Sequence, residues 1–462
     1  MFVRLPLLAL ASLRARLVSA LRLPAAVLAA VVVLTSGLAW TTEPLPRRLV
    51  IGIDGVGFAD MQASQQAGAF RAFYPVSRLI STFPSISDIA WSEIFQVAPP
   101  PGYQRVYFRL DEQRTIGGGL DPIRPIEFER RMHLGFDQKT HHLSSYVAPA
   151  RAARGELATL SRVFFEAHGI ETFYAYLPAP DAMQHVRGDL GRYLERLDGA
   201  LARLLATYRA RTGEDLELVL VSDHGHNGRW NAEMLDLPEF LKRHGYQVTR
   251  KIATPKDVVF STDGVTTGVG VFVAAPEVTR LATALATLRG VELVSWVPDG
   301  ATDRVGVRDA FGHQAWILRR ANGDLAYVPA SGDPLGYAPL VARLADSGLL
   351  DGAGFASSHA WLQVSATHEY PAALDRIVRG HHEVTQNPAP ILLSIADGFQ
   401  VANGMTSFFN QLRPLGGTHG GLNAVNSLGI VMSTYRPTSD TLSTDVARQF
   451  DGFARLPVLS TH

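Results

Sequence analysis

The sequence predicts an α/β fold in which a mostly parallel sheet is covered by helices on both faces and an α+β cap region is inserted. Two short, continuous apolar runs, at 49–53 and 216–221, are typical of strands buried in a parallel sheet. Segments with apolar residues at helical spacing alternate with such runs, the clearest being at 190–208. The chain has 462 residues and 47% apolar content, which is ample for a sizeable core.

The elements follow one another in a regular order. After the strand at 49–53, Asp54-Gly-Val-Gly57 predicts a turn and residues 61–73 predict a helix. The alternation then continues with a helix at 156–168, a strand at 172–176, the amphipathic helix at 190–208 and the strand at 216–221.

The pattern changes at about residue 252. Short alternating runs occur at 268–273 and 315–318, and Asn322-Gly323 between apolar runs predicts a hairpin turn. The apolar run at 391–395 predicts a return to the core sheet, and 429–432 predicts its last strand. We therefore expect four parts: an N-terminal signal peptide or anchor at 1–40, a first core part at 41–251, an inserted cap at 252–388 and a last core part at 389–462.

The first forty residues have the pattern of an export signal. A leader with four arginines precedes the uncharged segment Leu23–Trp40, in which small residues occupy positions 36, 37 and 39. We expect a cleaved signal peptide. An uncleaved anchor and a buried N-terminal helix are the alternatives. With either export signal, the rest of the chain is periplasmic or extracellular.

Charge and cysteine content exclude several classes of function. The 43 basic and 43 acidic side chains give a net charge of zero, which argues against a surface for duplex nucleic acid or for anionic membranes. We expect membrane contact only through an N-terminal anchor. The chain has no cysteine, so disulfides, thiolate metal sites and cysteine nucleophiles are excluded.

Three aspartates and three histidines form the candidate site. Two of the aspartates directly follow predicted strands, and the carboxyl ends of parallel strands meet at one sheet edge. Carboxylate and imidazole are ligands for zinc and similar divalent ions. The six residues, enough for two ions with open positions, are Asp54, Asp181, His185, Asp223, His224 and His419. Taken singly, each aspartate could be a helix cap and each histidine simply exposed.

A hydroxyl nucleophile is expected between Asp54 and Asp181. The stretch Ser81–Trp91 is rich in hydroxyl groups and leads into a helix predicted at 90–97. A hydroxyl at a helix start benefits from free backbone N–H groups, and metal coordination would lower its pKa. The alternative is that these hydroxyls only cap the helix.

Five motifs in order resemble the alkaline phosphatase superfamily, most closely its type I phosphodiesterase/nucleotide pyrophosphatase branch. They are Ile51-Gly-Ile-Asp54-Gly, Thr82-Phe-Pro-Ser-Ile-Ser87, Pro180-Asp181-Ala-Met-Gln-His185, Ser222-Asp223-His224-Gly225 and Thr418-His419-Gly420. The resemblance covers about 48–237 and 391–433. It implies an alkaline phosphatase-like fold and two zinc-like divalent ions, one held by Asp181, His185 and His419, the other by Asp54, Asp223 and His224 together with the nucleophile.

The resemblance leaves two candidates for the nucleophile. Aligned on Phe83-Pro and on Ala90-Trp91, the family pattern puts Ser87 at the nucleophile position. The pattern Thr-Phe-Pro-Asn would choose Thr82 instead. We favour Ser87, although Phe95-Gln-Val97 departs from the usual Thr-Gly ending of this helix.

The stretch between His224 and His419 is long for the family, so the cap at 252–388 is a candidate for encoding substrate choice. Four nearby side chains could face a substrate, but we expect them to be exposed at the surface: His226, Arg229, His381 and His382.

These expectations define a function. The resemblance implies a metal-dependent hydrolase of small phosphate esters, a phosphodiesterase or phosphatase, that acts through a phospho-seryl or phospho-threonyl intermediate. One alternative is a phosphoethanolamine-type phosphotransferase at the same site, and another is a metal-binding protein without turnover. A sulfatase is disfavoured because no arginine lies within Ser81–Ser87.

Overall fold

The computed structural model describes residues 43–117, 127–135, 148–186, 188–228, 232–260, 262, 264–401 and 416–450. Contacts divide the chain into two units, 1–45 and 46–462, and the described helices and strands all lie in the second. The predicted signal peptide or anchor at 1–40 lies outside the described residues. Within the described ranges, no helix combines the length and the apolar character needed to cross a bilayer.

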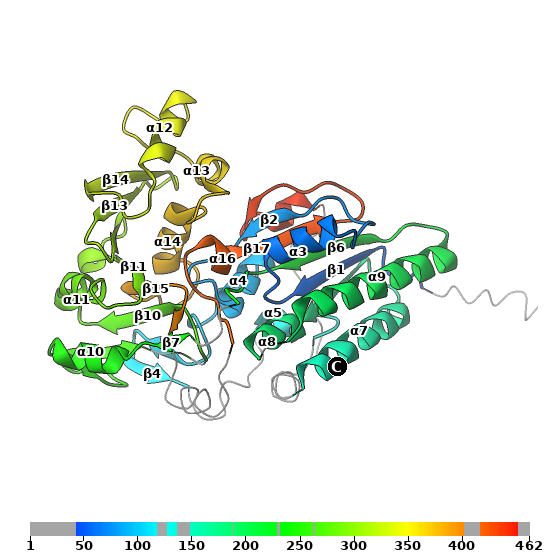
Figure 1. Ribbon diagram of the computed structural model, residues 1–462, viewed down its shortest axis with the longest axis horizontal. Coiled ribbons are helices and arrows are strands. Elements are labelled where there is room, and N and C mark those ends of the chain that lie inside the picture. The colour runs from blue at the N-terminus through cyan, green and yellow to red at the C-terminus, as the bar shows by residue number, and fades with distance from the viewer. Residues whose placement is uncertain are drawn as a thin grey trace, which may run out of the picture. The chain divides into compact units, whose positions relative to one another are not determined.

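A six-stranded sheet forms the first layer of the fold (Figure 1). Its strands, in spatial order, are β18 (Thr441–Leu442), β2 (Ser77–Ile80), β17 (Leu428–Ser433), β6 (Glu217–Ser222), β1 (Arg48–Ile53) and β5 (Thr172–Leu177). β1 pairs in parallel with β5 and β6, and β18 pairs in parallel with β2. β17 runs antiparallel to both of its neighbours, so the sheet is mixed.

Helices cover both faces of this sheet. On one face, Trp91 of α4 (Ser87–Ile94) and Phe128 of α5 (Glu127–Arg130) pack with Val50 and Tyr176 of the strands. On the other face, the Phe164 ring of α7 (Pro149–Glu166) contacts Phe173 of β5 edge to face. Helix α9 (Leu190–Thr212) lies beside α7, and α3 (Phe58–Gln66) contacts α9, β2 and β17 (Figure 1).

The predicted elements of this layer correspond to observed ones, with shifted ends. The helix predicted at 61–73 is shorter and earlier, because α3 ends before Gly68, whose φ of 96° is left-handed. The helix predicted at 90–97 begins at Ser87 and is α4. The described residues form a mixed α/β fold, which agrees with the predicted fold class.

A second sheet of eight strands lies mostly within the predicted cap. Its order is β14 (Leu325–Ser331), β13 (Gln314–Arg319), β12 (Arg304–Asp309), β11 (Val291–Trp296), β15 (Ile391–Ile395), β10 (Gly268–Val273), β9 (Asp257–Phe260) and β8 (Gln247–Val248). Its pairings are antiparallel except β8 with β9.

Helices also cover both faces of the second sheet. One apolar cluster contains residues of α10 (Leu237–Arg243) and α11 (Val278–Leu285). The other contains residues of α12 (Ala338–Asp346), α13 (Ser358–Ser365) and α14 (Ala373–His382). The remaining short elements are β3 (Tyr107–Arg109) paired with β4 (Arg114–Ile116), β7 (Glu233–Met234) paired with β16 (Phe399–Gln400), α8 (Ala179–His185), α16 (Ala424–Ser427) and 3₁₀ turns at Ala275–Glu277, Pro298–Gly300 and Val446–Gln449.

The prediction that 391–395 returns to the core sheet is wrong. The segment is a strand, β15, but it pairs with β10 and β11 in the middle of the second sheet. A mostly apolar strand suits any central position that is buried on both faces, so its composition does not choose between two sheets. The second sheet therefore extends from Gln247 to Ile395, beyond both ends of the predicted cap.

The two layers share apolar packing at the segment before α4 and at the first turn of α4. Phe83, Ile86 and Ile89 belong to the same buried cluster as Trp361 of α13 and Ile377 of α14. The hydroxyl-rich segment is consequently held between the six-stranded sheet and helices of the second layer.

Candidate metal centre and hydroxyl

One edge of the six-stranded sheet brings the three predicted aspartates together. Asp54 follows β1 and Asp223 follows β6, while β5 leads through a short loop to Asp181 on α8. These three strands are parallel neighbours, so their carboxyl ends lie at the same edge.

The antiparallel strand β17 adds His419 to the same edge. In its register, Ile430 lies opposite Ser222, so the amino end of β17 adjoins the carboxyl end of β6. The preceding loop, 416–423, therefore reaches the aspartates. Thr267 at the start of β10 donates its backbone N–H to the His419 carbonyl over 2.9 Å, and this bond braces the loop from the second sheet.

Ser87 lies inside this cluster and Thr82 is bonded elsewhere. Ser87 Oγ is 3.2 Å from Asp54 Oδ1 and 3.0 Å from His224 Nε2. The Thr82 hydroxyl is buried and donates to the Pro84 carbonyl over 2.7 Å. Of the two predicted nucleophiles, Ser87 is the one whose oxygen contacts the predicted metal ligands.

The six predicted ligands form a continuous group. His185 Nε2 is 3.3 Å from Asp181 Oδ2, and His419 Nε2 is 3.6 Å from Asp181 Oδ1. His224 Nε2 is 3.2 Å from Asp223 Oδ2 and 3.6 Å from Asp54 Oδ1. The rings of His224 and His419 stack with centroids 3.7 Å apart, which joins the two halves.

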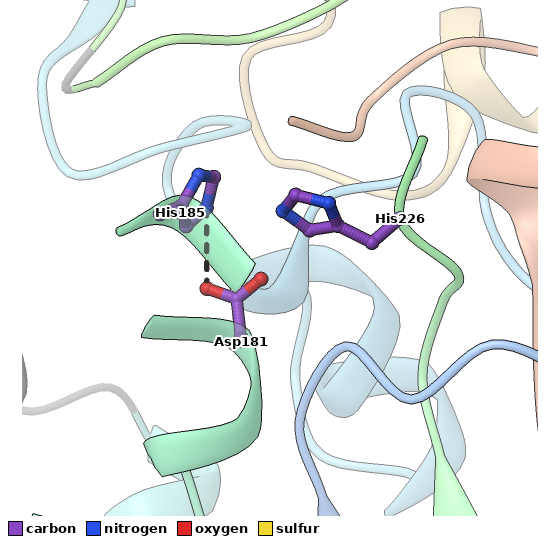
Figure 2. Close-up of side chains that lie close together, drawn as sticks. All are labelled: Asp181, His185 and His226. Atoms are coloured by element: carbon purple, nitrogen blue, oxygen red, sulfur yellow. Dashed lines mark ion pairs between the residues drawn. The ribbon is translucent and has the colours of Figure 1, made fainter. Parts of the chain in front are cut away.

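Three overlapping sets in this group have ligand atoms within 4.8 Å of one another: Asp54, Asp223 and His224; Asp181, His224 and His419; and Asp181, His185 and His226. The first is a set that the resemblance implied. The implied set of Asp181, His185 and His419 is divided between the other two, because the rings of His185 and His419 are 5.5 Å apart. His226 is an addition (Figure 2).

Burial and mutual repulsion shape the electrostatics of the site. Burial, reinforced by Asp223 and Asp181, raises the pKa of Asp54 well above its usual value, and burial raises the pKa of Asp223 to about 8. Burial acts in the same direction on Asp181, but attraction to His185, His419 and His224 outweighs it and lowers that pKa well below its usual value. Burial and the neighbouring His419 lower the pKa of His224 well below its usual value. Carboxylates gathered beside imidazoles form a site that favours bound cations.

The histidine orientations test whether a metal fits. Nδ1 of His185, His224 and His419 lies 2.8–2.9 Å from the carbonyls of Gly417, Gly225 and Ser85, respectively. A carbonyl can only accept, so each Nδ1 carries a hydrogen, and in the neutral ring that a metal binds, each Nε2 presents a lone pair to the carboxylates. Imidazoles that bind metals are usually held in this way, with the second ring nitrogen donating to the protein.

Two carboxylate oxygens support the same conclusion. Asp181 Oδ1 and Asp223 Oδ2 are buried and have no hydrogen-bond partner among the described residues. Unsatisfied buried oxygens that face imidazole lone pairs suit divalent ions. The residues therefore fit a binuclear site for zinc-like ions.

Two neighbours that the sequence interpretation missed shape the site. Tyr176 of β5 donates its hydroxyl to Asp54 Oδ2. Gly55 has a φ of 68°, and a Cβ there would lie 2.9 Å from Asp181 Cβ, so only glycine allows this approach of the turn to α8.

The expected surface exposure is wrong for two histidines. His226 is buried at the edge of the site, where its ring contacts that of His185 on α8. His381 is buried on α14, where its ring bonds Ser295 and the Ala389 carbonyl. His382 is partly buried, and Arg229 lies outside the described residues. The position of His226, two residues after His224, was the only sequence signal for it.

Comparison with known families gives one match. Residues 102–284 match the sequence model of the family described as type I phosphodiesterase / nucleotide pyrophosphatase. The match includes the segments of Asp181, His185, Asp223 and His224, and the resemblance inferred from the motifs is confirmed. A comparison with curated proteins found no match.

Solved structures with a similar chain course include human ectonucleotide pyrophosphatase/phosphodiesterase 5, at 11% identity and a TM-score of 0.46, covering 87% of this chain and 93% of that one. An inactive variant of the murine protein in complex with AMP aligns at 12% identity and a TM-score of 0.46, covering 90% of this chain and 97% of that one.

Proposed function

The chain resembles type I phosphodiesterases and nucleotide pyrophosphatases, and on that premise we propose that it is a two-metal hydrolase of small phosphate esters. The family match supports a phosphate ester hydrolase. The observation that carries the finer proposal is the position of Ser87, whose Oγ lies within 3.2 Å of both Asp54 and His224. We assign Ser87 as the nucleophile.

The proposed ligands divide between two ions. Asp54, Asp223 and His224 would hold one ion beside Ser87, and Asp181, His185 and His419 would hold the other. We expect zinc, because it favours mixed imidazole and carboxylate ligands with a position left open for substrate. Two such ions supply neutralisation of phosphoryl charge and a lowered pKa of the attacking hydroxyl.

The protein's own groups position the reacting atoms. Ser87 is the first residue of α4, so backbone N–H groups of the first helical turn lie free beside its hydroxyl. Ser87 Oγ forms a bond to phosphorus as the bond to the leaving alcohol breaks. Water then attacks the phosphoryl group on Ser87 and releases phosphate or a phosphomonoester, which restores the hydroxyl.

Export and substrate choice depend on segments outside the site. We propose that the protein is exported, on the pattern of residues 1–40, and that the 252–388 region contributes to substrate choice.

The nucleophile assignment is tested by Ser87→Ala. With bis-p-nitrophenyl phosphate and p-nitrophenyl phosphate as substrates, we expect wild-type turnover and a loss of about a thousandfold or more in the variant, as for other removed nucleophiles. Metal analysis should show that Ser87→Ala keeps both ions. An added alcohol acceptor distinguishes hydrolysis from phosphotransfer, because a transferase would release leaving group beyond one turnover only when the acceptor is present.

Thr82→Ala is the matched control. Its hydroxyl is bonded to the Pro84 carbonyl, so the variant should keep turnover. An active Ser87→Ala with an inactive Thr82→Ala would move the nucleophile to Thr82. Equal activity of the two variants would reject a covalent route through this segment, and a wild type that binds metal without turnover would reject the hydrolase.

A further inference from the structure

His226 occupies the site without an assigned role. It lies in the loop after β6 and is 7% exposed. Figure 2 shows the Asp181 carboxylate directed toward the space between His185 and His226. The rings of His185 and His226 have centroids 4.8 Å apart, and their planes are inclined by 72°. This side chain therefore faces the same space as the proposed ligands.

The hydrogen bonding of His226 differs from that of the other three site histidines. Its Nδ1 accepts the backbone N–H of Gly228 over 3.4 Å. In a neutral imidazole one nitrogen accepts and the other carries the hydrogen, so the hydrogen of His226 is on Nε2. That Nε2 is buried and has no hydrogen-bond partner among the described residues. His226 therefore presents a donor to the site where His185, His224 and His419 present lone pairs.

A buried donor without a partner is costly unless something binds it. Its position beside Asp181 and His185 is next to the ions that would bind the phosphoryl group. The matching acceptor is a phosphoryl oxygen, since hydrogen bonds to charged groups are the stronger ones.

We propose that His226 is a substrate-binding residue that donates its Nε2 hydrogen to an oxygen of the phosphoryl group. This inference rests on the proposed function for its substrate class. From distance alone, His226 could instead be a further metal ligand, in the set of Asp181, His185 and His226. The proposed role as a hydrogen-bond donor differs from that one.

The test compares the same substitution at two neighbouring histidines. We expect His226→Ala to keep both ions by metal analysis and to weaken binding of inorganic phosphate roughly ten- to a hundredfold, the usual effect of losing a hydrogen bond to a charged group. kcat/KM for p-nitrophenyl esters should fall by a similar factor. His226→Gln retains a donor and should recover part of both losses, whereas His185→Gln should lose metal.

The cobalt-substituted protein adds a readout without turnover. Its visible spectrum should be nearly the same in wild type and His226→Ala before phosphate is added, because the ligands are unchanged. Loss of metal or a changed resting spectrum in both His226 variants would make His226 a ligand and overturn the proposal. Unchanged phosphate binding in His226→Ala would overturn it as well.

Phosphate binding to the metal-loaded protein, measured by calorimetry, separates this inference from the proposed function. A wild type that binds phosphate through His226 but hydrolyses no ester refutes only the hydrolase. If wild type and His226→Ala hydrolyse esters equally well, only the role of His226 is refuted.

Discussion

At the scale of single residues, a partly buried glutamate outside the site, Glu292, is expected to make the free energy of unfolding depend on pH. Glu292 lies on β11, next to Ser394 Oγ, which donates to it over 3.1 Å. Burial, with repulsion from Glu369 and Asp397, raises the pKa of Glu292 to about 7 despite the hydrogen bonds from Ser394 and Tyr370. Ser394 Oγ also accepts the backbone N–H of Leu422, three residues after His419. The charge on Glu292 thus lies close to the loop that carries His419.

The folded protein binds the carboxyl proton of Glu292 more tightly than the unfolded chain does. The protonated carboxyl therefore stabilises the fold fully below the pKa of 4.5 in the unfolded chain, and this stabilisation is lost as pH rises through about 7. We expect Glu292→Gln to remove roughly 2–3 kcal/mol of pH dependence in the free energy of unfolding between about pH 5 and 8. Urea titrations of wild type and variant at both pH values measure this difference. Glu239→Gln, at an exposed position on α10, is the control and should leave the dependence intact. Identical pH profiles for wild type and Glu292→Gln would contradict the assignment.

Residue types and spacings were enough to predict that the six proposed ligands lie together. Asp54 and Asp223 follow strands that had to be parallel neighbours in an α/β sheet, so their convergence followed from topology. The sequence did not specify the hydrogen on each imidazole. Whether Nδ1 faces a carbonyl, as in His419, or a backbone N–H, as in His226, depends on a loop path that local patterns do not encode.

At the scale of elements, α14 holds the site together from the second layer. The Arg376 guanidinium is 1% exposed and donates to the carbonyls of Thr82 and Leu422 and to the hydroxyl of Ser85. Those acceptors belong to the segment before Ser87 and to the loop after His419. One side chain therefore fixes the spacing of two loops that supply the site.

We expect Arg376→Met to lower the free energy of unfolding by about 3 kcal/mol or more, because the methionine fills the space but leaves buried acceptors without donors. Chemical denaturation measures the loss, and metal analysis should show weaker retention of the ions. Arg343→Met on α12 is the matched control, since Arg343 is exposed and donates to a single carbonyl, that of Val364. If both variants lose the same free energy of unfolding, the buried contacts of Arg376 do not contribute to stability.

Local patterns predicted element types better than element partners. The apolar run at 391–395 is a strand, as expected, but its sheet was assigned wrongly because pairing depends on long-range register. The extent of α3 was also misjudged, since the apolar residues Phe70 and Phe73 continue the pattern beyond the helix end at Gln66. Hydrophobic spacing does not reveal where a left-handed residue stops a helix.

For the whole molecule, the proposed ions connect segments from Asp54 to His419. Removing them leaves buried carboxylates without a counter-charge, and burial together with repulsion from Asp223 and Asp181 raises the pKa of Asp54. We expect a chelator to lower the free energy of unfolding by about 4 kcal/mol for each ion, if free metal had stood a thousandfold above its Kd. Thermal unfolding with and without chelator, followed by zinc addition, measures this change.

Asp223→Asn is the informative variant for this experiment. It removes one proposed ligand, so chelation should change its unfolding less than that of wild type. A wild type whose unfolding temperature is the same with chelator and with zinc would contradict the binuclear site.

The place of β17 in the six-stranded sheet sets an order of events during synthesis. This strand, residues 428–433, lies between β2 and β6 and is the link through which β2 and β18 join the rest of the sheet. A growing polypeptide cannot close this layer until that late segment has left the ribosome. For the export proposed above, such a chain would still be open when it reached a translocation pore, and the proposed ions would bind only after the final strand had inserted.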